Sequence, residues 1–156
     1  MAVVSNSSPL IAFAAIEQLN LFPSLFESIL IPPAVALEIA PSIPTLPTWL
    51  RVETLSRPLP DAVLRRSLGA GEQEALALAV EIHAERILLD DRPARRVAST
   101  LNLSVTGTAG VLLAAKRHAL ISHIRPYLDA LVQKSFFIGP DLYDELLRLA
   151  GEQDAG

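Results

Sequence analysis

The chain has 156 residues, of which 51% are hydrophobic and 19% charged, with a formal net charge of −4, which suits one compact domain and argues against disorder. It contains no cysteine, which excludes disulfides, thiolate metal sites and thiol nucleophiles, and leaves oxygen or imidazole to hold any metal. The first six residues lack the charged start of a signal peptide, and no apolar stretch approaches the roughly 20 residues of a membrane span, which predicts a soluble cytoplasmic protein without a membrane partner.

Apolar runs alternate with helix-start signals along the first half of the chain. Residues 3–5 have the composition of a short buried strand, and Ser7 or Ser8 can cap a helix from Pro9, because proline is favoured at the first helical position. Asn6 then lies at the turn between this strand and this helix. The next predicted elements are helices over 20–26, from Pro33 through Glu38, and over 60–68, with strands at 29–31 and 51–55.

The same alternation continues through the second half. Asp90 and Asp91 are expected at a turn between a strand and a helix. The predicted elements are helices over 72–84, 93–101, 109–118, 122–134 and from Pro140 onward, with strands at 87–89, 103–105 and 136–138. Such alternation predicts an α/β fold with a mainly parallel sheet covered on both faces. We assign residues 1–150 to a single domain and residues 151–156 to a short polar tail.

Acidic and amide residues follow apolar strands or begin helices at several points of this pattern. They are Asn6, Glu38, Glu72, Glu74, Asp90 and Asp91. Because a parallel sheet gathers polar groups outside the carboxyl ends of its strands, these side chains are expected to form one pocket. Oxygen ligands of this kind favour a hard cation, so the sequence predicts a site for Mg²⁺ or Mn²⁺.

Each of these residues also has a purely structural interpretation. Asn6 can cap the first helix, and either Asp90 or Asp91 can cap the helix that follows them. Glu38 can face solvent on an amphipathic helix. Glu72 and Glu74 lie in the first turn of a helix, where the helix dipole favours carboxylates. One aspartate of the doublet is left unexplained by a capping role.

Other common sites are excluded by their motifs. The three histidines lack the spacing of a catalytic zinc site, and neither a Walker A loop nor a GxGxxG turn follows any predicted strand. Three arginines, Arg92, Arg95 and Arg96, flank the aspartate doublet and can either lie on a solvated helix surface or contact phosphate.

Five segments resemble the PIN-like domains, and among them the VapC-type toxin ribonucleases and their uncharacterised relatives. The segments span residues 4–11, 33–38, 68–79, 88–98 and 105–112. The resemblance implies an α/β/α sandwich that uses Mg²⁺ or Mn²⁺ to cleave single-stranded RNA. The first acidic position of the family corresponds to Asn6, the second to Glu38, the third to Glu74 with Glu72 as a rival, and the fourth to Asp91 beside Asp90.

The resemblance also implies partners. RNA contacts are expected from Ser7, Arg92, Arg95, Arg96 and Thr108, and an antitoxin protein is a further expected partner. The small charged fraction indicates a homodimer, with an interface in helices near 19–26 and 43–50 that expose Phe22 and Trp49.

Asn6 stands where the family has an aspartate, and this departure opens an alternative. An amide oxygen can ligate a cation but carries no charge, so metal binding is expected to be weaker than in the family. The alternative is a catalytically weakened RNA-binding or regulatory module.

Two other function classes remain to be weighed. Phosphotransfer by an aspartyl nucleophile at position 6 is disfavoured, because an amide cannot attack. A third interpretation is an interaction module whose C-terminal helix presents Leu142, Leu146 and Leu149 to a partner, although the core is the preferred place for these side chains.

Overall fold

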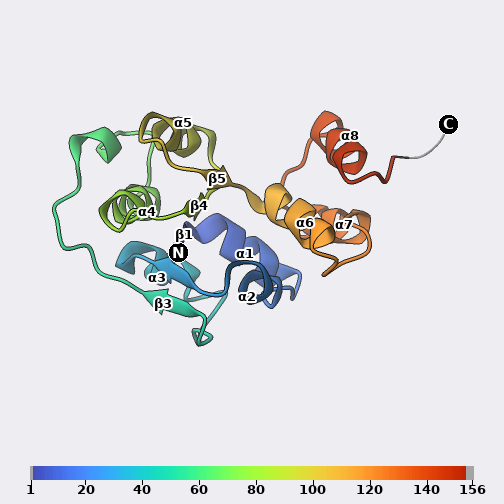
Figure 1. Ribbon diagram of the computed structural model, residues 1–156, viewed down its shortest axis with the longest axis horizontal. Coiled ribbons are helices and arrows are strands. Elements are labelled where there is room, and N and C mark those ends of the chain that lie inside the picture. The colour runs from blue at the N-terminus through green and yellow to red at the C-terminus, as the bar shows by residue number, and fades with distance from the viewer. Residues whose placement is uncertain (1, 154–156) are drawn as a thin grey trace.

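The central feature of the fold is a five-stranded, all-parallel sheet with the strand order β3-β2-β1-β4-β5 (Figure 1). The computed structural model describes residues 2–153, so residues 154–156 of the predicted tail lie outside the described residues. The strands are β1 (Val3–Ser5), β2 (Ile29–Ile31), β3 (Leu50–Val52), β4 (Arg86–Leu88) and β5 (Val105–Thr106). The predicted parallel sheet is confirmed, and the strands before Asn6, Asp90 and Gly107 are neighbours.

Helices cover the sheet in the arrangement that the alternation of elements predicts. They are α1 (Ser7–Ala15), α2 (Leu21–Phe26), α3 (Pro33–Ile39), α4 (Ala70–Glu81), α5 (Arg92–Thr100), α6 (Thr108–Arg117), α7 (Arg125–Gln133) and α8 (Pro140–Leu149). Figure 1 shows α4 on one side of the central strands and α1 on the other, and α6 contacts α1 and α2. The predicted α/β/α sandwich is therefore confirmed. None of the helices within residues 2–153 has the length and apolar character needed to cross a membrane.

An aromatic cluster in the core corrects the expected dimer interface. Phe22 is fully buried, with its ring centroid 4.9 Å from that of Phe13 and 5.9 Å from that of Trp49. The expectation that Phe22 is exposed was wrong, because α2 turns this ring inward onto α1. Residues 43–50 form no helix; they run through turns into β3. The homodimer itself stays a prediction.

Two further predicted elements do not form. Between 60 and 68 the only helical turn is a 3-10 helix (Asp61–Val63), because the chain buries Val63 and Leu68 but leaves Leu64 55% exposed, which breaks the helical apolar spacing. Residues 136–138 form no strand, since Phe137 is 89% exposed and the sheet ends at β5. A short apolar run does not by itself identify a strand.

In α8 the predicted apolar face is only partly buried. Of its leucines, Leu146 and the neighbouring Leu147 are buried, whereas Leu142 and Leu149 are about half exposed. The helix therefore packs on the rest of the domain through a narrower stripe than the leucine spacing predicts.

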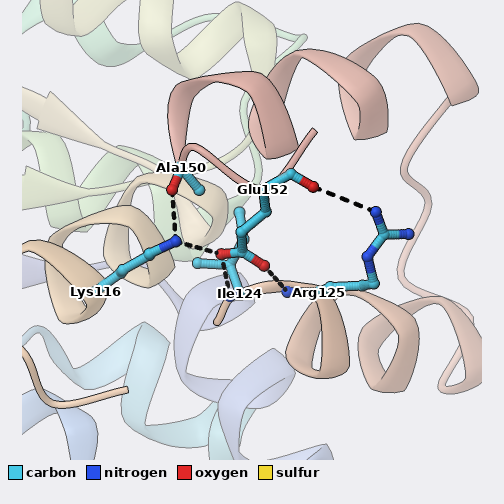
Figure 2. A network of polar contacts seen from close by, with 5 residues as sticks. All are labelled: Lys116, Ile124, Arg125, Ala150 and Glu152. Atoms are coloured by element: carbon cyan, nitrogen blue, oxygen red, sulfur yellow. Dashed lines mark hydrogen bonds and ion pairs between the residues drawn. The ribbon is translucent and has the colours of Figure 1, made fainter. Parts of the chain in front are cut away.

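A glutamate from the segment predicted as a polar tail fastens this end of the chain (Figure 2). The Glu152 side chain is only 5% exposed and accepts hydrogen bonds from Lys116 Nζ at 2.9 Å and from the Ile124 N–H at 2.7 Å. Arg125 N–H donates to the other carboxylate oxygen at 3.2 Å. Burial alone would raise the pKa of Glu152, but these hydrogen bonds outweigh it and hold the pKa below its ordinary value. A carboxylate thus stabilises the N-terminus of α7, where the helix dipole favours negative charge.

Candidate metal centre

Asn6 occupies the carboxyl end of the central strand. Its backbone N–H donates to Leu88 O at 2.9 Å, which joins the ends of β1 and β4, and the residue is only 2% exposed. It stands at the N-cap position of α1, yet its side chain makes no capping hydrogen bond. Among the residues that the structure describes, nothing donates to its buried Oδ1. The capping interpretation therefore does not account for this side chain.

The carboxylate of Glu38 reaches from the exposed face of α3 to the start of α4. There it lies against Gly71: a Cβ atom built on Gly71 would sit 1.7 Å from Glu38 Oε1. Any residue other than glycine would have to displace this carboxylate. The sequence indicated Gly71 only as a residue near a helix start, and its position directly before Glu72 is the one signal that could have revealed this close approach.

Glu72, in the first turn of α4, is the most perturbed acid of this edge. Its Oε2 is buried and accepts no hydrogen bond from any residue between 2 and 153. Burial raises the pKa of Glu72 above its ordinary value, and the negative charge of Asp91 raises it further. A hydrogen bond from the Gly69 backbone opposes this rise, and Glu38 adds to it. The carboxylates of Asp91, at the start of α5, and of Glu38, on α3, thus both disfavour the charged form of Glu72.

Asp91 combines a structural and an electrostatic role. It is the N-cap residue of α5, and its Oδ2 accepts a hydrogen bond from the Ala94 N–H at 3.2 Å. The capping interpretation is therefore correct for Asp91. The same carboxylate contributes to the raised pKa of Glu72, so it also faces the acidic cluster.

The remaining two acids are held by backbone and hydroxyl donors. Glu74 Oε1 accepts a hydrogen bond from the Ala34 N–H at 3.0 Å, which ties α4 to the first turn of α3. Asp90 accepts from the Thr108 N–H and from the Thr108 hydroxyl, both at 2.7 Å. The structure thus groups Glu38, Glu72 and Asp91 electrostatically, with Asn6 at the same edge, and places Glu74 and Asp90 in hydrogen bonds that position helices.

The residues expected to contact RNA divide into two sets. Arg92, Arg95 and Arg96 are exposed on α5. Ser7 and Thr108 are buried, with exposed fractions of 8% and 0%, and Thr108 is engaged with Asp90. Thr108 therefore acts by positioning Asp90, a role that the sequence did not predict.

The oxygen atoms at this edge are donors suited to a divalent cation. Within residues 2–153, no three acidic or histidine side chains converge closely enough to form a ready-made metal site. Two buried oxygen atoms, Asn6 Oδ1 and Glu72 Oε2, nevertheless lack the donor that a buried acceptor requires. A hard cation is a partner that suits oxygen atoms of this kind, and its charge would offset the effect of Asp91 and Glu38 on Glu72. The residues therefore fit Mg²⁺ or Mn²⁺.

Comparison with known proteins decides the family. Residues 2–152 match the family described as DUF3368, a PIN domain. The chain belongs to the PIN-domain family. PIN domains are generally nucleases that depend on divalent metals.

A solved structure supports this assignment at the level of the fold. It is a PilT N-terminus domain protein from the hyperthermophilic archaeon Sulfolobus solfataricus P2, which aligns with a TM-score of 0.55 and 17% identity. The alignment covers 74% of this chain and 93% of the archaeal chain. No curated protein matches the sequence.

Proposed function

We propose that this PIN domain is a metal-dependent endoribonuclease that cleaves single-stranded RNA. The observation that carries the proposal is the pair of buried oxygen atoms, Asn6 Oδ1 and Glu72 Oε2, which have no donor within the described part of the chain. Each buried acceptor without a donor lowers the stability of the fold by about 1–3 kcal/mol. Such atoms therefore favour a bound partner that satisfies them. A bound cation is the partner that suits them.

The proposal assigns a role to each side chain of the site. Asn6, Glu38, Glu72 and Asp91 would hold the ion. Glu72 is preferred to Glu74 as the third acid, because Glu72 Oε2 is buried without a donor in the described chain, whereas Glu74 Oε1 accepts from the Ala34 N–H. A bound Mg²⁺ or Mn²⁺ would activate a water molecule and stabilise charge on the phosphodiester. Asp90 and Thr108 hold the ends of β4 and α6 together. Arg92 and Arg95 would contact phosphate oxygens.

The amide at position 6 sets the expected level of activity. Because Asn6 supplies an oxygen without charge, the native protein should bind the ion weakly and cleave slowly. Asn6→Asp adds a carboxylate beside Glu72 and Asp91, which should tighten the ion and increase the rate of RNA cleavage.

The experiment is turnover of a labelled single-stranded RNA in Mn²⁺, with EDTA as the control, for the native protein and Asn6→Asp. We expect slow cleavage by the native protein and faster cleavage by the variant, both abolished by EDTA. If Asn6→Asp remains inert while calorimetry detects bound Mn²⁺, the nuclease proposal fails. The catalytically weakened RNA-binding module then takes its place.

We further propose that the nuclease is the toxin of a toxin–antitoxin pair. This proposal rests on the resemblance of five sequence segments, residues 4–11, 33–38, 68–79, 88–98 and 105–112, to VapC-type toxins. Induced expression of Asn6→Asp should arrest growth, whereas the double variant that combines Asn6→Asp with Glu72→Gln should not. Equal growth of the two strains, with equal amounts of soluble protein, would contradict the toxin role.

A further inference from the structure

A groove lies at the free edge of the sheet. It has a volume of about 960 Å³ and is lined by β5, α6 and the segment from Phe136 to Leu142. Its lining includes Asp90, which follows the carboxyl end of β4, and Arg86, which begins the same strand. Figure 1 shows β5 between α5 and α8. The groove is far larger than an ion needs and lies near the upper limit of ligand pockets, roughly 1,000 Å³.

The lining of the groove is strongly basic although the chain as a whole is acidic. Four arginines, Arg86, Arg92, Arg95 and Arg117, face one aspartate, Asp90, whose oxygens already accept the Thr108 hydrogen bonds. No acidic side chain within residues 2–153 forms a salt bridge with Arg92, Arg95 or Arg117. The net charge of the lining is therefore positive, against −4 for the whole sequence. Cations gathered without acidic partners indicate an anionic ligand.

The groove also offers an aromatic surface. Phe137 lies on its wall with 89% of its surface exposed, and its ring rests beside Gly139. Along α6 the lining includes the small residues Ala109, Gly110 and Ala114, and Gly110 packs so closely on β5 that a Cβ atom there would lie 2.9 Å from the Thr106 methyl group. An exposed ring beside arginines suits a single-stranded nucleic acid. An unpaired base can stack on the ring, because every base has a face that stacks on an aromatic side chain, and the phosphates can contact the arginines.

We propose that a single strand of RNA is bound along this groove, with its phosphates on Arg92, Arg95 and Arg117 and a base on Phe137. The inference rests on the proposed nuclease function and adds the path that the strand takes beyond the acidic site. Asp90 lines the groove and directly precedes the proposed site acid Asp91 in the sequence, so the groove lies close to the acidic edge. A nucleic acid is favoured over a polypeptide because basic and aromatic side chains line the same groove.

The test separates binding from cleavage by omitting the metal. A fluorescent RNA of roughly ten nucleotides is titrated with protein in EDTA, and fluorescence anisotropy is followed at several salt concentrations. Arg117→Ala should weaken binding about fivefold at 0.1 M salt and lower the slope of log K against log salt by about 0.7, the value for one lost phosphate contact. Arg51→Ala is the matched control, because Arg51 is an exposed arginine on β3, at the opposite edge of the sheet. It should leave the RNA affinity near the native value.

Phe137 provides an independent second probe. Phe137→Ala should weaken RNA binding about tenfold without changing the salt slope, since stacking carries no charge. Phe137→Leu keeps an apolar side chain without a ring and should lose nearly as much affinity. If Phe137→Leu binds RNA as the native protein does, the stacking contact is wrong.

Further outcomes decide between the groove and the nuclease. If Arg117→Ala and Phe137→Ala bind RNA as tightly as Arg51→Ala does, the groove proposal is overturned. The nuclease proposal, which the cleavage assay tests, is then unaffected. If the native protein binds no RNA in EDTA and Phe137→Ala changes only its oligomeric state by light scattering, the groove belongs to a second copy of the chain. Loss of binding in the groove variants, together with an inert Asn6→Asp, would keep the groove and reject the nuclease.

Discussion

Two carboxylates on opposite sides of the domain differ in their hydrogen bonds and in the direction of their pKa shifts. Glu152 is nearly buried, is bonded to Lys116, Ile124 and Arg125, and has a pKa held below its ordinary value. Glu72 is partly buried beside Asp91, keeps one oxygen without a donor in the described chain, and has a raised pKa. The first stabilises the fold as it stands, whereas the second leaves a buried acceptor without a donor in the described chain, which costs the fold free energy. The contrast separates a structural acid from a site acid.

Replacing the site acid should have the largest effect. Glu72→Gln removes the charge but keeps the shape, and the rate of RNA cleavage in Mn²⁺ should fall at least about 100-fold. Even residues that only hydrogen-bond to metal ligands lower metal affinity or activity by about 10–100-fold when they are replaced. Glu74→Gln should cost less activity, because Glu74 is bonded to the α3 backbone. Initial rates of the two variants in one assay check the order, and a greater loss in Glu74→Gln would reverse the assignment.

Adding metal should stabilise the protein only when Glu72, one of the proposed ligands, keeps its charge. At Mn²⁺ one hundred times its Kd, the free energy of unfolding should rise by about 2.7 kcal/mol. For a chain of this length this corresponds to an increase in Tm on the order of 8 °C. Thermal melts should give this increase for the native protein and for Glu152→Gln, but not for Glu72→Gln. An equal increase in all three would place the ion elsewhere.

Replacing the structural acid should lower stability and spare the chemistry. Glu152→Gln loses hydrogen bonds to a charged group and should lower the free energy of unfolding by about 2 kcal/mol. Because the folded pKa of Glu152 is lowered, this stabilisation is present above the ordinary glutamate value near 4.3 and is lost as pH falls through the folded pKa. Urea unfolding from pH 7 to pH 3 should therefore show the two proteins converge in acid.

The smallest expected effect is the opposite pH response of the site acid. Because the folded pKa of Glu72 is raised, the metal-free native protein binds its proton more tightly when folded, and stability falls as pH rises from the ordinary value through the folded pKa. Glu72→Gln cannot ionise there, so it should become the more stable protein as pH increases. Urea unfolding in EDTA measures the difference, and a variant that loses stability with rising pH relative to the native protein would contradict the like-charge cluster.

Much of the fold could be predicted because its local signals agree with its tertiary contacts. The strands before Asn6 and Asp90 are apolar and short, and the helices after them begin with proline or capping residues, so periodicity and capping lead to the same elements. The predictions failed where the apolar character of a side chain did not indicate whether that side chain is buried. Phe22 is buried on Phe13 and Phe137 is exposed, and no spacing rule separates the two rings.

The position of Asn6 and Asp91 in the fold could be predicted from the sequence, but the hydrogen bonds of the individual acids could not. Parallel strands bring Asn6 and Asp91 to one edge, which follows from topology alone. The choice between Glu72 and Glu74 depends on which carboxylate meets the Ala34 N–H, a contact between residues 40 positions apart. Glu152 lies in a segment that its composition predicts to be a polar tail. Only its packing against α6 and α7 buries the carboxylate, which accepts hydrogen bonds from backbone N–H groups there.

The position of β1 in the middle of the sheet governs when the acidic edge can exist during synthesis. β1 is made first, yet it pairs with β2 at Leu30 and with β4 only at residues 86–88. Parallel pairing over such separations forms late, because the intervening loop must close first. At roughly 5–20 residues per second, β4 follows β1 by about ten seconds. During that interval the growing chain gains first Glu38 and then Glu72 while Asp91 is still absent, and the edge that carries Asn6 and Asp91 is completed only when β4 docks beside β1.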